Sequence, residues 1–119
     1  MYLLCTDGVA EFDLATQRFK TLLQGNVDAI YFNEKLYIGK REEVFVYNES
    51  TGNFDLFYHL AGKNITLSCL HLDKNKNLWM GTTSNGIYCL SEDKSLSRPV
   101  TKGNITSIYE DSSNELWIG

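Results

Sequence analysis

The sequence predicts an all-β fold built from a repeated β-hairpin, and three observations lead to this prediction. Residues 104–119, NITSIYEDSSNELWIG, place a polar turn between two short apolar runs and end on glycine, which is the pattern of a hairpin. The phrase recurs as NITLSCLHLDKNKNLWMG at 64–81 and more faintly as NVDAIYFNEKLYIG at 26–39. Apolar residues keep no helical spacing over any long stretch, so strands are favoured throughout.

The spacing of the copies indicates how the hairpins are arranged. The stretch 11–19 aligns with 46–54 at an offset of 35, Trp79 and Trp117 are 38 residues apart, and Tyr37 precedes Trp79 by 42. A period of about 35 to 42 residues with four short strands is what a β-propeller blade requires. We therefore expect a propeller segment of about three four-stranded antiparallel blades in an incomplete ring. The expected blades are 1–23 (partial), 26–59, 64–100 and 104–119 (partial).

The strands expected within these blades are rich in β-branched and aromatic residues, and clusters of Asp, Asn, Gly and Ser separate them. In the first two blades they are 2–5, 9–14, 18–23, 27–32, 35–39, 44–47 and 54–59. In the last two they are 66–72, 78–81, 86–90, a weaker strand at 97–100, and then 105–109 and 116–118. Three short segments link one blade to the next, at 24–26, 61–64 and 102–104.

Equivalent positions of the copies share a type of residue. A small residue stands at Ala29, Cys69 and Ser107, a large ring at Tyr37, Trp79 and Trp117, and glycine at Gly39, Gly81 and Gly119. An inner propeller strand lies between neighbouring blades, so small and apolar side chains suit both of its faces. We expect the rings to be largely buried between blades, that of Trp117 provided that its neighbours are present, and the glycines to mark a bend or a close backbone approach.

Composition excludes several classes of function. The net charge of −4 over 119 residues leaves no basic stripe for nucleic acid. No apolar run approaches the roughly 20 residues of a spanning helix, and MYLLCTDG lacks the basic start of a signal peptide, so no membrane contact is expected in this segment. The cysteines Cys5, Cys69 and Cys89 form no CxxC pair, and we expect them to be unpaired packing residues.

Neither catalytic nor metal-binding chemistry is predicted. Residues 73–77, DKNKN, resemble the opening of a calcium loop, but Leu78 stands where that loop needs glycine and Ser84 where it needs a bidentate Glu. His59 and His71 lie in strand-like stretches and are read as ordinary strand residues. With no nucleophile elbow or acid pair at matched positions, we expect no enzymatic activity, no cofactor and no metal.

The last two copies resemble the repeat of two-component regulator propellers. In that repeat an I-T-S-I-x-x-D strand meets a polar turn and an L-W-I-G-T strand, and ITSIYEDSSNELWIG and LDKNKNLWMGTTSNGIYCL follow this pattern. The copy at 26–47 departs from it, with Tyr37 for Trp and a charged turn at 41–43. The family comprises periplasmic sensor regions of hybrid histidine kinases, mostly from saccharolytic gut bacteria.

The resemblance implies a function for the parent protein. It implies a periplasmic, ligand-sensing propeller, with an oligosaccharide or another sugar as the ligand, in a two-component signalling system whose kinase lies outside this chain. The alternative is a propeller that serves only as a protein-interaction scaffold, although the Trp-Asp hallmark of WD repeats is missing. Turns after the second strand of each blade vary most between copies, so Lys40, Arg41 and Asn85 are the candidate ligand-binding residues.

Both ends of the chain read like interior copies, because MYLLC and ELWIG are as apolar as the repeats between them. Stacked repeats need polar caps to stay soluble. We therefore expect the chain to pack against further blades, from the same protein or from other copies in a homo-oligomer.

Overall fold

The computed structural model describes residues 2–5, 8–60, 65–97 and 103–119, with only the backbone of Leu3 and Cys5. These residues form strands and turns, so the prediction of an all-β fold is confirmed. The strands are β1 (Tyr2–Cys5), β2 (Gly8–Asp13), β3 (Arg18–Gln24), β4 (Ala29–Asn33), β5 (Lys35–Lys40), β6 (Glu43–Asn48), β7 (Asn53–His59), β8 (Leu67–Leu72), β9 (Leu78–Thr82), β10 (Ile87–Leu90), β11 (Ile108–Glu110) and β12 (Leu116–Ile118). Within this part of the chain, no helix is long and apolar enough to span a membrane.

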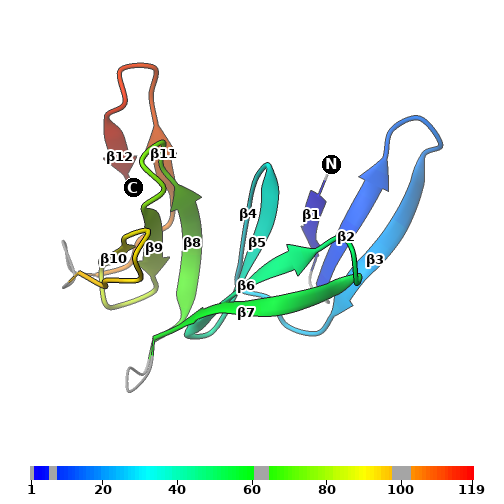
Figure 1. Ribbon diagram of the computed structural model, residues 1–119, viewed down its shortest axis with the longest axis horizontal. Coiled ribbons are helices and arrows are strands. Elements are labelled where there is room, and N and C mark those ends of the chain that lie inside the picture. Colours follow the sequence, from blue (N-terminus) through cyan, green and yellow to red (C-terminus); the bar gives the residue numbers. More distant parts are fainter. Residues whose placement is uncertain (1, 6–7, 61–64, 98–102) are drawn as a thin grey trace.

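The strands form antiparallel sheets that follow one another along the chain: β1-β2-β3, β4-β5-β6-β7, β8-β9-β10 and β11-β12. Each sheet is a meander, and the sheets stand side by side in an open arc that the described residues do not close (Figure 1). The innermost strands hold the arc together, because β4 contacts β8 and β8 contacts β11. This is the arrangement expected of successive propeller blades.

The strand register confirms the alignment of the copies. In the β4–β5 hairpin Ala29 pairs with Gly39, and in the β8–β9 hairpin Cys69 pairs with Gly81. Ser107 and Gly119 exchange backbone hydrogen bonds in the same way. Each small residue therefore faces a glycine across the innermost strand pair. The rings follow the same register, with Tyr37 opposite Tyr31, Trp79 opposite His71 and Trp117 opposite Tyr109.

The repeated glycines exist because adjacent blades approach closely there. A Cβ on Gly39 would lie 3.2 Å from the Cβ of Leu67, which belongs to the following sheet. At Gly81 the added atom would lie 2.4 Å from Cys69 Sγ and 2.8 Å from Ile105, just before the last sheet. Real Cβ atoms do not approach other atoms within 3.0 Å, so Gly81 is required both by Cys69 of its own sheet and by Ile105 beside the last sheet, and not by its backbone angles.

Two apolar clusters fill the spaces between sheets, and the alternation of side chains along each strand supplies both. One cluster, with Val9, Val27, Leu36 and Ile38 at its centre, lies between the first and second sheets. The other lies between the second and third sheets and combines residues of β4–β7 with residues of β8–β10. Its buried members are Ala29, Tyr37, Val44, Leu60, Ile65, Leu67, Leu70, Leu78, Met80, Tyr88 and Leu90.

The hairpin turns of the last two copies are built alike around one aspartate each. Asp73 Oδ1 accepts the backbone N–H groups of Asn75 and Asn77, and Asp73 Oδ2 accepts the indole N–H of Trp79 at 3.0 Å. Asp111 makes the equivalent bonds, including one of 2.9 Å from Trp117. The aspartate thus fixes the turn and orients the ring of the second strand.

The ring positions differ from expectation in burial. Tyr37 is buried, Trp79 is half-buried and Trp117 is 58% exposed. Trp79 stays near the surface because its indole N–H reaches out to the turn aspartate. Trp117 is exposed because no described sheet packs on its face of β11–β12, which is the condition that the prediction attached to it.

Some expected elements begin later than predicted or fall outside the described residues. β4 starts at Ala29 instead of residue 27. The backbone N–H of Asp28 donates to the carbonyl oxygen of Gly39. The final inner strand starts at Ile108 instead of residue 105. Of the outer strand expected at 97–100 the structure describes only Ser97, whose N–H donates to the Cys89 carbonyl oxygen next to a bridge between Leu90 and Leu96. Residues 98–100, like the link at 61–64, lie outside the described part of the chain.

Candidate functional site

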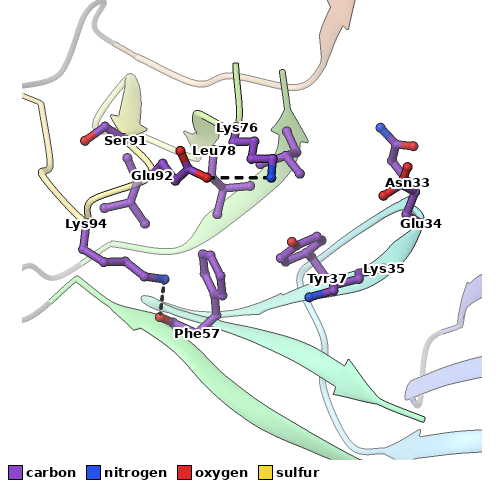
Figure 2. A pocket seen from close by; sticks show the side chains of 12 residues that line it. Asn33, Glu34, Lys35, Tyr37, Phe57, Lys76, Leu78, Ser91, Glu92 and Lys94 are labelled. Atoms are coloured by element: carbon purple, nitrogen blue, oxygen red, sulfur yellow. Dashed lines mark hydrogen bonds and ion pairs between the residues drawn. The ribbon is translucent and has the colours of Figure 1, made fainter. Parts of the chain in front are cut away.

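A cavity of about 270 Å³ lies between the second and third sheets, at the end where the β4–β5 and β8–β9 hairpins turn (Figure 2). One wall comes from β4, β5 and β7 with the β4–β5 turn. The other comes from β8, β9 and β10 with the β8–β9 turn and the turn that follows β10. The lining residues are Asn33, Glu34, Lys35, Tyr37, Phe57, Leu72, Lys76, Leu78, Leu90, Ser91, Glu92 and Lys94. We call this cavity the inter-blade pocket.

The inside of the inter-blade pocket is aromatic and aliphatic. The rings of Tyr37 and Phe57 meet edge to face with their centroids 5.4 Å apart, and Leu78 and Leu90 are buried behind them. Figure 2 shows the Tyr37 hydroxyl turned toward the space between the sheets. Burial, followed by the nearby Tyr31, raises the pKa of Tyr37, so this hydroxyl is neutral at physiological pH.

The rim of the pocket is charged, and most of its charges are already engaged. Lys94 Nζ donates to the Phe57 carbonyl oxygen at 3.2 Å and lies 3.1 Å from the centroid of the Phe57 ring, which joins the third sheet to the second. Burial lowers the pKa of Lys94. Lys76 Nζ pairs with Glu92 at 3.8 Å. Among the described residues, no hydrogen bond or ion pair engages the Lys35 ammonium.

The residues selected from the sequence lie at the other end of the strands. Lys40 ends β5, whereas Lys35 begins it, so they are five residues apart along the strand, or roughly 17 Å at the usual rise. Arg41 is exposed, and its N–H donates to Asp28 while its carbonyl accepts Leu67 N–H of the following sheet. Asn85 occupies the equivalent turn after β9, where it bridges to Gly103. These three residues occupy corresponding turns of adjacent blades, and none of them lines the inter-blade pocket.

The other residues considered for chemistry have structural partners. His71 Nε2 lies 3.4 Å from Glu110 of the last sheet, and His59 Nε2 lies 3.5 Å from Glu42. Cys69 and Cys89 are unpaired, as predicted, whereas the thiol of Cys5 lies outside the described residues. Within the described part of the chain, no three His, Cys, Asp or Glu side chains are grouped to hold a metal ion. The carboxylate of Asp73 is occupied by its own turn.

Sequence reasoning missed the pocket because its residues come from six strands and three turns of different copies. The sequence identifies Tyr37 as a ring of the repeat, whereas Phe57 stands out only as part of the expected strand 54–59. The sequence feature that could have pointed to the pocket was the departure of the 26–47 copy from the repeat, with Tyr37 in place of Trp. That change puts a phenolic hydroxyl where the later copies have an indole bonded to aspartate.

Two segments of the chain match a known protein family. Residues 59–84 and 99–119 match the family described as two component regulator propeller. The matched segments contain the two copies whose sequences resemble this family most. No curated protein matches the chain.

Solved structures share the fold over almost the whole chain. The extracellular domain of one hybrid two component system of B. thetaiotaomicron superposes with a TM-score of 0.79 at 22% identity, covering 99% of this chain and 18% of that one. That of a second such system gives a TM-score of 0.67 at 21% identity, covering 96% and 16%. Virginiamycin B lyase from Staphylococcus aureus gives 0.73 at 14% identity, covering 95% and 42%. The fold is that of a β-propeller segment, and the chain spans 18% of the length of the first of these structures.

Proposed function

We propose that this chain, two segments of which match the two component regulator propeller family, forms part of the extracytoplasmic sensor region of a hybrid two-component system. The observation that carries the proposal is the agreement of two independent comparisons. The repeats at 59–84 and 99–119 match the family by sequence, and nearly the whole chain superposes on extracellular domains of such systems. The same relatives support a location outside the cytoplasm, and we propose that this location is the periplasm.

The sensed ligand that we propose is a carbohydrate. Sugar sites in proteins combine aromatic faces with hydrogen-bonding side chains at a concave surface. The inter-blade pocket offers the rings of Tyr37 and Phe57 beneath a rim of amide, hydroxyl and charged groups. The turns that carry Lys40, Arg41 and Asn85 remain a second candidate surface, since two of these three side chains are exposed.

In this proposal the chain binds and does not catalyse. Its part in signalling is to change how neighbouring blades are positioned when the ligand binds. A kinase elsewhere in the protein would respond to that change. The partners are therefore a small saccharide and further propeller blades, from the same protein or from another copy.

A panel of oligosaccharides tests the proposal by thermal shift of the protein at its natural length. A ligand that binds only the folded state raises the melting temperature by mass action, with about 2.7 kcal/mol of stabilisation at a hundredfold excess over its Kd. We expect one class of saccharide to raise the melting temperature in a concentration-dependent way. No shift with any saccharide, together with a shift on adding a purified partner protein, would replace this proposal with the scaffold alternative.

A further inference from the structure

We propose that the inter-blade pocket binds a single sugar ring that carries an anionic substituent, a carboxylate or a sulfate, with the Tyr37 hydroxyl and the Lys35 ammonium as its main polar contacts. This inference rests on the proposed saccharide-sensing function. It adds a place for the ligand and a chemical class, neither of which follows from the repeats or from the fold.

The size of the cavity selects a single ring. Its volume of about 270 Å³ lies just below the roughly 300–1,000 Å³ of typical small-molecule pockets. The Phe57 and Tyr37 rings offer an apolar surface against which the C–H face of a sugar can pack. A longer saccharide would place one unit in the pocket and leave the others at the charged rim.

The Tyr37 hydroxyl is the first polar contact because the protein leaves it unused. The residue as a whole is only 6% exposed and no described residue forms a hydrogen bond with its hydroxyl, but the hydroxyl oxygen is not sealed from solvent, because it opens onto the pocket. Tyr31, on the neighbouring strand, differs in this respect, since its hydroxyl donates to the Leu72 carbonyl oxygen at 3.2 Å. A hydroxyl that bonds nothing in the protein and opens onto a cavity can both donate to and accept from a ligand.

The charges around the pocket select an anion. Lys76 is neutralised by Glu92, and Lys94 is committed to Phe57. The Lys35 ammonium lies beside the Tyr37 ring in Figure 2, whereas Glu34 stands at the far rim with Asn33. A cation without an ionic partner beside a hydroxyl that opens onto the pocket is suited to an acidic group, because charge-assisted hydrogen bonds are about twice as strong as neutral ones.

The test measures binding of three probes, glucuronic acid, glucose 6-sulfate and glucose, to the protein at its natural length by calorimetry or ligand-observed NMR. We expect at least one acidic probe to bind about tenfold more tightly than glucose. The Tyr37→Phe variant should weaken binding of that probe about five- to tenfold, and its melting temperature should stay close to that of the wild type because the lost hydroxyl bonds nothing in the protein. The Lys35→Gln variant should abolish the preference for the acidic probe while glucose binding is kept.

Matched substitutions elsewhere provide the controls. Tyr109→Phe removes a hydroxyl from the exposed face of β11, and Lys20→Gln removes a charge from β3, so both should bind like the wild type.

Equal affinity for glucose and both acidic probes overturns the anionic class. Acidic binding that survives Tyr37→Phe and Lys35→Gln but is lost in Lys40→Gln overturns the location and favours the turns at Lys40 and Asn85. In both cases the saccharide-sensing function stands, whereas it fails only if the oligosaccharide panel shows no binding at all.

Discussion

The second and third sheets face each other across a filled interface, whereas the last sheet presents the equivalent surface uncovered. Tyr37 on β5 is 6% exposed, and Trp117, at the same repeat position on β12, is 58% exposed. Its cross-strand neighbour Tyr109 is 63% exposed. The local geometry does not explain this difference, because strand register, the glycine and the turn aspartate of the last copy match those of the copy before it.

The comparison separates what one repeat determines from what two repeats determine. A single copy contains enough information for the hairpin, since Asp111 positions Trp117 as Asp73 positions Trp79. Burial, the close approach at glycine and the inter-blade pocket need a second sheet. Stability should accordingly depend on nearest neighbours, as in other repeat proteins.

The largest expected effect is on the free energy of unfolding, and it appears when equivalent leucines of the two regions are compared. Leu78 is 1% exposed between the second and third sheets, so Leu78→Ala should cost about 2–5 kcal/mol in the free energy of unfolding. Leu116, its counterpart on β12, is only half-buried, and Leu116→Ala should cost about 1 kcal/mol or less. Urea denaturation of both variants measures the difference. Equal costs would mean that the last sheet is packed as tightly as the interior ones.

A smaller effect is expected at the repeated glycines. Gly81→Ala would place a methyl group 2.4 Å from Cys69 Sγ and 2.8 Å from Ile105, which we expect to cost about 1–3 kcal/mol through overpacking. Gly39→Ala meets its nearest atoms at 3.2 Å, so it should cost less. Thermal unfolding of the two variants sharpens the comparison of the two interfaces. A Gly81→Ala protein as stable as the wild type would contradict the close approach of Gly81 and Ile105.

The turn aspartates should produce the smallest effect, and one that depends on pH. Burial raises the pKa of Asp73, but hydrogen bonds from Trp79, Asn77 and Asn75 outweigh it and bring the pKa below its ordinary 3.8. A lowered pKa stabilises the fold above the unfolded-state pKa, and that stability is lost as pH falls through the folded-state value. Asp73→Ala should therefore cost about 1–2 kcal/mol at pH 7 and progressively less below about pH 4.

The equivalent change in the last hairpin is the control for this prediction. Hydrogen bonds from the Trp117 indole and the turn N–H groups lower the pKa of Asp111, whose partner Trp117 is itself exposed. Asp111→Ala should have a smaller effect than Asp73→Ala at every pH. A cost for Asp73→Ala that does not change between pH 7 and pH 3 would show that its charge plays no part.

The repeat made much of the fold predictable. Recurrence of the small residue, the ring and the glycine gave the alignment of the copies, and the structure agrees with it, because Ala29 pairs with Gly39 as Cys69 pairs with Gly81. The predicted strand starts were less accurate. At Asp28 the backbone N–H donates to the Gly39 carbonyl oxygen, and the carboxylate accepts the Arg41 N–H, before the regular strand ladder begins. Such local competition by side chains is invisible to an apolar pattern.

The candidate site was much less predictable than the fold. Sequence variability between copies selected Lys40, Arg41 and Asn85, which are turn residues of single blades. The inter-blade pocket depends on Lys94 of the third sheet reaching Phe57 of the second, a contact across 37 residues. No periodic pattern encodes such a pair, because it arises from the packing of two sheets and not from either sheet alone.

Light scattering on the 119-residue polypeptide tests the central claim that one face of the last sheet requires another blade. The exposed rings of Tyr109 and Trp117 predict that the polypeptide associates at micromolar concentration, and that Trp117→Lys shifts it toward single chains. In a protein that contains a further blade on this face, Trp117 should be as protected from quenchers as Trp79. A stable, monodisperse single chain with a cooperative melt and a fully quenchable Trp117 would contradict the account.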